Sequence, residues 1–279
     1  MMVAVTDSPL KPGSRSESAK VPTVGVVLPV CNGARTVGAA IESILAQTYG
    51  NWRLYVVIDR SSDQTVSIVR GYERDDARIV VIENPERRGL AYALNVGWRT
   101  ATEPLIARAD ADDLCMAERL ERQVAYLTQY PAVAVLGTGV LLARDDGSEA
   151  GVHRRPAAHE ELVRKIFREC PFMHPSVMMR RSFLETMGGY NETLRVAEDY
   201  DLWLRGAHAH RYANLQELLV RYTVSGSSSS TKWGHTLGAV SVLLRHGAAH
   251  RRRLESVYYS ARYMLAGALT RARLRRRRL

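Results

Sequence analysis

The first 110 residues alternate between short apolar runs and stretches in which apolar residues recur at helical spacing. Four runs have the length and β-branched content of buried strands: Val24–Val30, Leu54–Ile58, Ile79–Ile82 and Pro104–Ala107. The intervening stretches carry the helical spacing: Thr36–Gln47, Gln64–Tyr72 and Gly89–Arg99. Strands that alternate with helices predict βαβ units, so we expect an α/β, Rossmann-like domain with a mostly parallel central sheet flanked by helices.

The pattern changes after the fourth strand. A helix is predicted from Leu120 to Gln129, followed by a strand over 132–143. Asp146-Gly147 then gives the turn of a hairpin. A further helix is predicted from Glu198 to Arg205, after a mixed and more polar segment.

Ser225–Ser230 contains mainly Ser and Gly, a composition typical of a flexible linker. We end the main domain there, because the sequence that follows returns to helical spacing. The predicted organisation has four parts: a disordered N-terminal segment (1–20), a single domain (21–224), a linker (225–235) and an amphipathic, basic helical tail (236–279).

The net charge of +10 resides in the C-terminal tail. From Arg245 to Leu279 there are eleven Arg and one acid, so the rest of the chain is formally neutral. The apolar residues of the tail fall near one helical face: Leu254, Val257, Tyr258, Ala261, Leu265, Ala268 and Leu269. A basic amphipathic helix predicts binding to an anionic membrane surface. The alternatives are a helix packed on the domain, ahead of a solvated Arg run, and, less favoured, a nucleic-acid contact.

Other targeting signals are absent from the sequence. No apolar run approaches the roughly 20 residues that a membrane-spanning helix needs, and the Ser-, Pro- and Lys-rich first 20 residues lack the apolar region of a secretory signal. The three cysteines form no C-x-x-C pair, so neither a zinc site nor a disulfide framework is indicated. We expect a cytoplasmic protein attached peripherally to the inner face of the cell membrane.

The acidic cluster Asp110-Ala111-Asp112-Asp113 follows a predicted strand. Three carboxylates within four residues repel one another, and a cation relieves that repulsion. Hard oxygen ligands suit Mg²⁺ or Mn²⁺. The alternative is a solvated loop that caps the following helix. In parallel sheets ligands bind beyond the carboxyl ends of the strands, which favours the metal site.

Two further acidic positions could carry chemistry. Asp59 ends the second predicted strand, so it should share a rim with the acidic cluster, either as a turn residue or as an acceptor for a nucleobase or ribose. Glu198-Asp199 opens a helix, where N-capping and general-base catalysis are both compatible with a carboxylate. No G-x-G-x-x-G follows the first strand and no Walker A sequence occurs, which counts against a dinucleotide oxidoreductase and a P-loop NTPase.

An ordered series of segments resembles the family 2 glycosyltransferases, which have the GT-A fold. The resemblance covers roughly Val21 to Tyr222, and its segments occur in the family's order. They are Val26–Gly33, Ser43–Tyr49, Val56–Asp63, Gly89–Asn95, Ile106–Asp113, His174–Met178, and Gly188–Tyr190 leading to Glu198–Arg205.

The resemblance implies a role for each matching position. On the nucleotide-sugar side we expect Pro29, Val30, Asn32, Asp59, Asn95 and Asp110, with Asp59 at the base. Asp110 and Asp112 match the D-x-D positions, which implies Asp112 as the direct ligand of Mn²⁺ or Mg²⁺ with Asp110 beside it. Asp199 matches the catalytic base, and the acceptor side would comprise Glu198, Trp203 and His174.

The implied reaction is an inverting displacement at the anomeric carbon of a nucleoside-diphosphate sugar, with a UDP-sugar favoured. Asp199 would take the proton of an acceptor hydroxyl on a glycan or lipid-linked acceptor, as in surface polysaccharide biosynthesis. The chain departs from the family pattern at Cys31, where an aromatic residue is common, at Arg60, where Gly is usual, and at Ala117, where Pro is usual.

Two other functions remain open on the sequence alone. A nucleotidyltransferase would also bind a nucleotide through acidic loops, but it would need a Gly-rich basic loop where the chain has only Asn32–Arg35. A basic module for membrane or nucleic-acid interaction would act through the tail. Deletion of 245–279 separates these classes, because we expect the enzyme to retain soluble turnover and to lose membrane attachment.

Overall fold

The computed structural model describes residues 21–224, 229–249 and 251–276. Its first half has four strands: β1 (Val24–Val30), β2 (Trp52–Asp59), β3 (Ile79–Asn84) and β4 (Leu105–Arg108). The helices between them are α1 (Val37–Leu45), α2 (Thr65–Asp75) and α3 (Leu90–Thr100). The strands lie in the order β3-β2-β1-β4, and each neighbouring pair is parallel. The predicted βαβ organisation is therefore confirmed for this half.

The second half of the sheet is mixed. β8 (Met178–Arg180) runs antiparallel to β4 and to β6 (Val133–Arg144), and β9 (Arg211–Val224) runs parallel to β6. Two short additions are antiparallel: β5 (Leu114–Cys115) on β9, and β7 (Glu149–His153) on β6. The predicted hairpin turn at Asp146-Gly147 joins β6 to β7. The described strands thus form one nine-stranded sheet.

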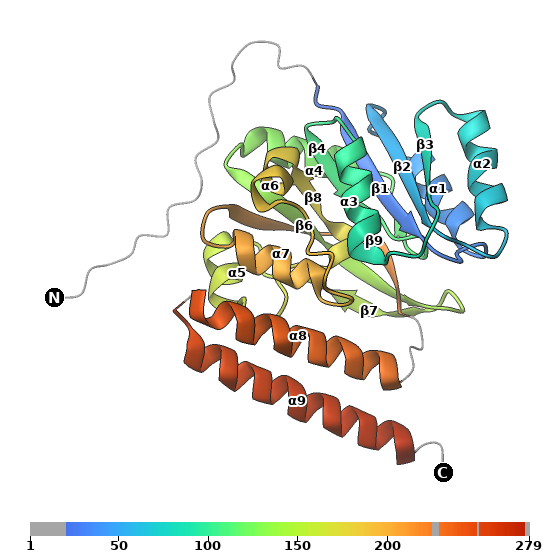
Figure 1. Ribbon diagram of the computed structural model, residues 1–279. Helices are drawn as coiled ribbons and strands as arrows, with labels where there is room; N and C mark the ends of the chain where they lie inside the picture. The colour runs from blue at the N-terminus through green and yellow to red at the C-terminus, as the bar shows by residue number, and fades with distance from the viewer. Residues whose placement is uncertain (1–20, 225–228, 250, 277–279) are drawn as a thin grey trace.

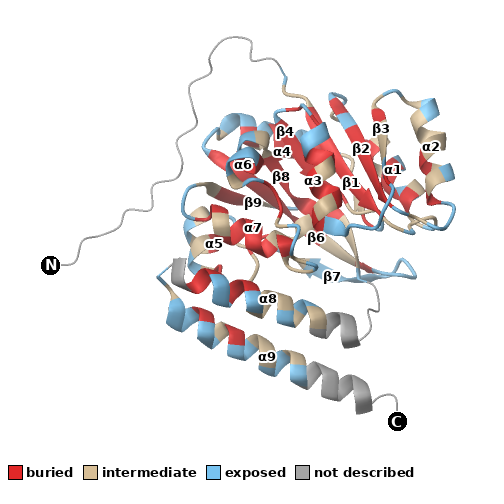
Figure 2. Cartoon of the chain, viewed as in Figure 1, coloured by how far each residue is buried: buried red, intermediate tan, exposed pale blue. Residues whose placement is uncertain are grey.

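Apolar cores lie on both faces of the sheet, because alternate side chains of each strand point to opposite faces. On one face, Val26 and Leu28 of β1 pack with residues of α1, α2 and α4 (Arg119–Gln129). On the other, Val27 packs with α3 and with an aromatic group around Trp203. That face also holds three shorter helices: α5 (His159–Lys165), α6 (Arg181–Met187) and α7 (Glu198–Gly206). Figure 2 shows the buried strands between these layers.

The C-terminal tail is a pair of helices rather than one. α8 (Ser229–Ala249) runs alongside α7, and α9 (Arg253–Arg276) runs back alongside α8 (Figure 1). α8 buries Val242 and Leu243 in the core shared with α7. This corrects the predicted organisation, because the linker expected over 225–235 is helical from Ser229 and the first tail helix packs on the domain. The predicted disordered segment (1–20) lies outside the described residues.

Candidate active site

A cleft of about 760 Å³ lies beyond the carboxyl ends of β1 and β4. One side is formed by Pro29 and Val30 at the end of β1 and by Asn32 in the loop that follows, and the other by Asp110 and Asp112. The two loops are about eighty residues apart in sequence. They meet because β1 and β4 are parallel neighbours, so their carboxyl ends reach the same edge.

The loop after β1 is held by the loop after β2. Asn32 has a left-handed backbone (φ 53°), a conformation that Asn tolerates better than most residues. Its amide N–H donates to Ser61 Oγ (2.9 Å), and its Oδ1 accepts from the backbone N–H of Ser62 (2.8 Å). Gly33 N–H donates to Thr65 Oγ1 (2.9 Å). These bonds fix the wall of the cleft before any ligand binds.

The acidic cluster has the geometry of a cation site. Asp110, Asp112 and Asp113 each offer one carboxylate oxygen, and the three atoms lie within 4.8 Å of one another. Partial desolvation, followed by the charge of Asp110, raises the pKa of Asp112. A divalent cation would remove the electrostatic repulsion between these carboxylates.

Asp113 has a structural partner. Its Oδ1 accepts the backbone N–H of Thr223 (2.7 Å), which ties the cluster to β9. Burial, with the charge of Asp110 as the next cause, raises the pKa of Asp113 to about 8. Asp110 is paired differently, with the buried guanidinium of Arg108. Asp112 is the exposed member of the cluster, and its side chain is directed to the cleft that it lines.

A second cavity, of about 510 Å³, adjoins the cleft. Asp110 lines both of them, and the second also holds Arg108, His174, Glu198 and Asp199. The start of α7 thus faces the acidic cluster across Asp110. Two groups of carboxylates that are almost ninety residues apart in sequence belong to one continuous site.

The two carboxylates at the start of α7 are held in a largely buried setting. Ala197, directly before them, has a left-handed backbone (φ 60°), which is unusual for a residue with a Cβ. Asp199 Oδ1 accepts the N–H of Tyr200 (2.7 Å). Burial raises the pKa of Asp199, and burial together with the Asp199 charge raises that of Glu198 to about 7. Both carboxylates therefore bind a proton more readily than an exposed acid does, and they titrate as a coupled pair.

His174 faces this carboxylate pair. Its Nδ1 lies 3.9 Å from Glu198 Oε1 and 4.0 Å from Asp199 Oδ2, while its Nε2 is 3.0 Å from Tyr190 Oη. Burial and the nearby Arg108 charge lower the pKa of His174 well below its usual value, so the ring is neutral. His174 lines the second cavity, which agrees with its expected position beside the acidic pair.

Three residues expected at the site are placed differently. Trp203 has an exposed fraction of 0% and packs in the aromatic core, with its ring 6.2 Å from that of His174, so it supports the cavity wall from behind. Asn95 is also 0% exposed, and its side chain bonds the backbone N–H and C=O of Tyr190 (2.9 and 2.8 Å). The structure thus places both side chains in the packing behind the cavity wall, while the contacts expected of Trp203 with an acceptor and of Asn95 with a nucleotide sugar stay predictions.

Asp59 is the third of these. It is 5% exposed, and its two oxygens accept from the backbone N–H groups of Arg88 (2.9 Å) and Gly89 (2.7 Å) and from Asn84 Nδ2 (3.2 Å). Asp59 is absent from the described residues that line either cavity. In this structure Asp59 orders the loop that leads into α3, and its expected contact with a nucleobase stays a prediction.

Sequence reasoning missed two contributors to the site. Arg108 ends β4, has 3% of its side chain exposed, and lies between the two groups of carboxylates. α8 contributes His235, Thr236 and Ala239 to the second cavity. Arg108 could have been recognised in the sequence as a charged residue inside an apolar strand. The contribution of α8 could not be recognised, because α8 reaches the cavity only through its tertiary contact with α7.

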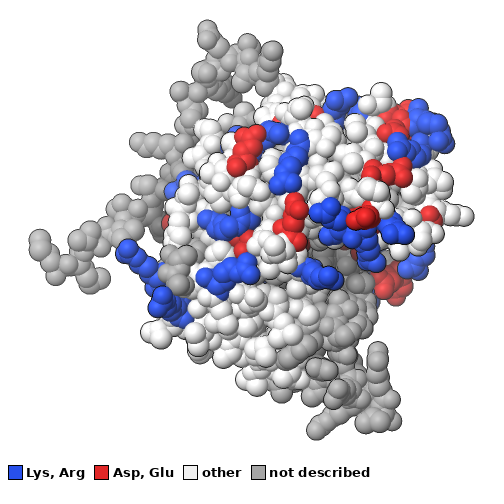
Figure 3. Space-filling view, in the orientation of Figure 1, with Lys and Arg blue, Asp and Glu red and all other residues white. Residues whose placement is uncertain are grey.

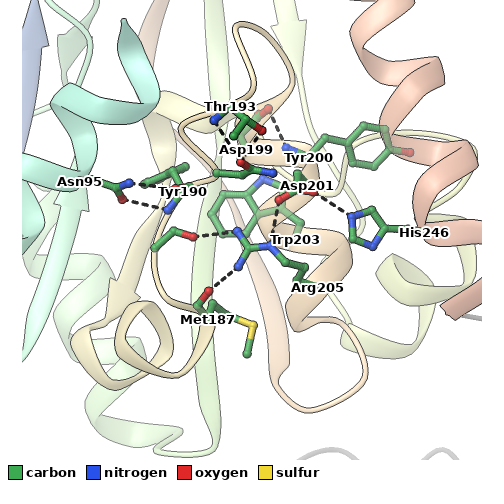
Figure 4. A network of polar contacts seen from close by, with 12 residues as sticks. Asn95, Met187, Tyr190, Thr193, Asp199, Tyr200, Asp201, Trp203, Arg205 and His246 are labelled. Atoms are coloured by element: carbon green, nitrogen blue, oxygen red, sulfur yellow. Dashed lines mark hydrogen bonds and ion pairs between the residues drawn. The ribbon is translucent and has the colours of Figure 1, made fainter. Parts of the chain in front are cut away.

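The contact between α7 and α8 includes a buried hydrogen bond to a carboxylate. Asp201, 1% exposed, accepts from His246 Nε2 (2.8 Å) and from Arg205 Nε (2.8 Å) (Figure 4). These bonds lower the pKa of Asp201 despite its burial. Gly238 of α8 also approaches Val196 so closely that an added Cβ would lie 2.4 Å from a Val196 methyl carbon. α8 thereby holds the segment that carries Asp199.

We expect His246→Ala to lower the free energy of unfolding by about 1–3 kcal/mol, because it leaves a buried carboxylate with one partner fewer. Urea unfolding of the full chain measures this. The double variant with Asp201→Asn is the matched control, since the cost of losing His246 should shrink once the carboxylate charge is gone. An equal cost in both backgrounds would contradict the role of the His246–Asp201 hydrogen bond.

The cleft, the acidic cluster and the second cavity lie beyond the carboxyl ends of parallel strands, where α/β enzymes bind their ligands. The family model for glycosyl transferase family 2 matches residues 25–188, and the chain belongs to this family. The resemblance drawn from the sequence motifs and the GT-A fold are both confirmed. The protein is thus a glycosyltransferase.

Individual relatives agree with this. "Putative glycosyltransferase EpsE" of Bacillus subtilis (strain 168) is 39% identical over 215 residues, which cover 76% of each chain. The UDP-Glc:alpha-D-GlcNAc-diphosphoundecaprenol beta-1,3-glucosyltransferase WfgD of Escherichia coli is 28% identical over 88% of this chain and 93% of its own. The mannosyltransferase PcManGT from Pyrobaculum calidifontis, solved with GDP-Man and Mn²⁺, shares the fold with a TM-score of 0.66 at 19% identity, over 96% of this chain and 82% of that one.

Among the described residues, every helix is too short or too polar to cross a membrane.

Proposed function

We propose that this glycosyltransferase is a metal-assisted, inverting enzyme. It moves a sugar from a nucleoside-diphosphate-sugar donor, most simply a UDP-sugar, to a hydroxyl of a glycan or lipid-linked acceptor in surface polysaccharide biosynthesis. The observation that carries the proposal is that Asp110 lines both cavities. A donor in the first cleft and an acceptor in the second would meet beside Asp110, with Asp199 on the acceptor side.

The first cleft fits a nucleoside diphosphate and a hard cation. Asp112, with Asp110 beside it, would hold Mn²⁺ or Mg²⁺, because three carboxylate oxygens within 4.8 Å match the ligand preference of these ions. When bound, the cation neutralises the charge that builds on the leaving diphosphate. Pro29 and Val30 at the end of β1, and Asn32 in the loop after it, border the nucleotide. A UDP donor is supported by the name of WfgD.

The second cavity fits the acceptor. Asp199 accepts the proton of the attacking hydroxyl, and its remaining oxygen, Oδ2, is directed toward His174 and the cavity. Oδ1 is held by the N–H of Tyr200, so the carboxylate cannot rotate freely. Glu198 and His174 orient the acceptor. Because attack comes from the side opposite the diphosphate, the product carries the inverted anomeric configuration.

A panel of nucleotide sugars tests this proposal. Purified full-length protein is incubated with UDP-, GDP- and dTDP-sugars, with Mn²⁺, with Mg²⁺ or with EDTA, and nucleoside diphosphate release is measured. We expect release from at least one donor, dependent on the cation. Failure of every donor with both cations would contradict the proposal. NMR of the product with an active donor then reports whether the configuration is inverted.

We further propose that α9 lies on an anionic membrane surface at the inner face of the cell membrane. Leu254, Val257, Tyr258 and Leu265 recur on one face of α9 and have exposed fractions of 87%, 58%, 58% and 63%. The lower surface in Figure 3, over α8 and α9, is largely without charged side chains and has basic ones at its margin. Arg251, Arg253 and Arg262 are exposed around this face. Exposed apolar side chains beside arginines can combine apolar burial with attraction to anionic lipid.

Replacement of Leu254, Val257 and Leu265 by Gln should lower binding to vesicles of anionic lipid at least about tenfold, because each apolar side chain contributes to insertion. Cosedimentation at several salt concentrations measures this, and binding should also weaken as salt rises. Val152→Gln on β7, an exposed apolar position away from the tail, is the control. Unchanged vesicle binding by the triple variant would exclude this face as the contact.

A further inference from the structure

The second cavity contains a group of side chains of metal-binding types, apart from the acidic cluster. His174, Glu198 and Asp199 each offer one donor atom, and the three atoms lie within 4.8 Å of one another. His174 lies in the short 3-10 helix His174–Ser176, and the two acids open α7. A general base needs one carboxylate, so the close approach of a second carboxylate and an imidazole points to a further ligand.

The carboxylate of Glu198 is buried without a hydrogen bond from another residue. Its side chain is 7% exposed, and no other described residue donates a hydrogen bond to it; His174 Nδ1, at 3.9 Å, is too distant. Burial of a carboxylate without a donor is costly, and a bound cation removes that cost. Because Glu198 lines the cavity, an ion can reach its carboxylate from solvent.

His174 is held in the form that binds metal ions. Burial and the charge of Arg108 lower its pKa, so the ring is neutral, as a metal-binding imidazole must be. Its Nε2 is 3.0 Å from Tyr190 Oη, which leaves Nδ1 facing the two carboxylates. With a metal on Nδ1, Nε2–H would donate to Tyr190, an arrangement that orients histidine ligands. Asn95 in turn fixes Tyr190 through both of its backbone groups (Figure 4).

The donor atoms and the local charge favour Zn²⁺. The group offers one imidazole nitrogen and two carboxylate oxygens, and Cys170 Sγ lies 3.9 Å from Asp199 Oδ2. Nitrogen and sulfur donors suit Zn²⁺, whereas the oxygen-only acidic cluster suits Mg²⁺ or Mn²⁺. The Arg108 charge nearby is offset by its pairing with Asp110.

The spacing of the donor atoms is close to that of a zinc site. His174 Nδ1 lies 3.9 Å from Glu198 Oε1 and 4.0 Å from Asp199 Oδ2. Ligand atoms around a tetrahedral Zn²⁺ are about 3.4 Å apart. The side chains would therefore have to approach one another by only about half an ångström.

We infer that His174, Glu198 and Asp199 form a Zn²⁺ site, and that the bound ion inhibits sugar transfer. This ion is distinct from the cation of the donor cleft. It occupies the Asp199 oxygen that faces the cavity, so that oxygen no longer accepts the proton of the acceptor hydroxyl. The inhibition rests on the proposed function, whereas the binding of Zn²⁺ requires no donor or acceptor.

Zn²⁺ binding is measured first, on the full-length protein in excess Mg²⁺, by competition with a chromophoric chelator. We expect His174→Ala and Glu198→Gln each to weaken binding about tenfold or more, because each removes a direct ligand. Tyr190→Phe should weaken it about tenfold, since the imidazole loses its orienting partner. Asp112→Asn should retain this site. His208→Ala, at an exposed position after α7, is the matched control.

Inhibition is measured next, by titration of Zn²⁺ into the transfer reaction at saturating Mn²⁺. Each variant is compared with its own turnover without Zn²⁺. We expect the half-inhibiting concentration to rise about tenfold in Tyr190→Phe and to stay unchanged in His208→Ala. A further excess of Mn²⁺ should not relieve the inhibition, since the two ions occupy different sites. Anomalous scattering from a crystal soaked in Zn²⁺ then locates the ion.

A Zn²⁺ peak beside His174 Nδ1 and both carboxylates is the expected result. Equal Zn²⁺ affinity in His174→Ala and the wild type, or a peak only at the Asp110–Asp112 cleft, would overturn the site and leave the glycosyltransferase proposal intact. Zn²⁺ bound there without loss of transfer would overturn the inhibition. A failure of the proposed function is distinguishable, because it would show as no nucleoside diphosphate release from any donor before Zn²⁺ is added.

Discussion

Asp199→Asn should lower kcat by at least about a thousandfold, because the amide cannot accept the proton of the attacking hydroxyl. The variant keeps the shape of the side chain, so Oδ1 can still accept from the N–H of Tyr200 and the fold should survive. The measurement is transfer to acceptor under saturating donor, with circular dichroism and thermal unfolding as checks on folding. Asp75→Asn, an exposed acid at the end of α2, is the control.

The same carboxylate predicts the pH dependence. Burial raises the pKa of Asp199, and Glu198 beside it titrates near 7, so protonation of the pair removes the base as the pH falls. We expect kcat/KM to decline on the acidic side of neutrality and to reach a plateau above it. If Asp199→Asn turned over almost as fast as the wild type, Asp199 would not be the general base.

The second large loss of activity is expected for Asp112→Asn. It should lower kcat/KM about a thousandfold, since the loss of a direct ligand weakens the cation that stabilises the leaving diphosphate by several kcal/mol. Titration of Mn²⁺ against nucleoside diphosphate release measures it, and a high concentration of Mn²⁺ should recover part of the activity. Asp75→Asn, at an exposed position at the end of α2 that does not line the cleft, should behave as the wild type.

A dependence on Mn²⁺ that is identical in Asp112→Asn and the wild type would move the cation site elsewhere. The Asp113 carboxylate is the nearest alternative, but its Oδ1 is already used by the backbone of Thr223. Replacement of Asp113 should therefore affect folding more than the requirement for metal.

The fold of the first half could be read from the sequence because its signals are local. The run Val24–Val30 is the observed β1, residue for residue, and the parallel order of β1–β4 follows from strands that alternate with helices. β8 and β9 could not be foreseen in the same way. β8 is three residues long, and both strands pair with partners distant in sequence.

The sequence predicted those site residues whose placement depends only on where a strand ends or a helix begins. Asp110 and Asp112 line a cleft because β4 ends there, and Asp199 lines a cavity because α7 begins there. Asn95 and Trp203 show the opposite case. Their side chains are of kinds that bind sugars and nucleotides, but they point into the core, and only tertiary packing determines that direction.

The C-terminal tail is a third case in which the structure could not be predicted from the sequence alone. Small polar residues before α8 indicated a linker, yet α8 forms a helix that packs on α7, since tertiary contacts override local propensity. The expected tolerance to deletion of 245–279 changes accordingly, because that deletion removes His246 from the buried Asp201. A truncation that begins at Arg253 removes α9 alone and is the better separation of turnover from membrane attachment.

The most direct test of the account is a crystal structure of the full chain with Mn²⁺ and the nucleoside diphosphate of an active donor, with the metal located by anomalous scattering. We expect the Mn²⁺ peak beside Asp112, the nucleotide along the loop after β1, and the diphosphate facing the cavity that contains Asp199. A metal and nucleotide bound away from the Asp110–Asp112 cleft would contradict the account.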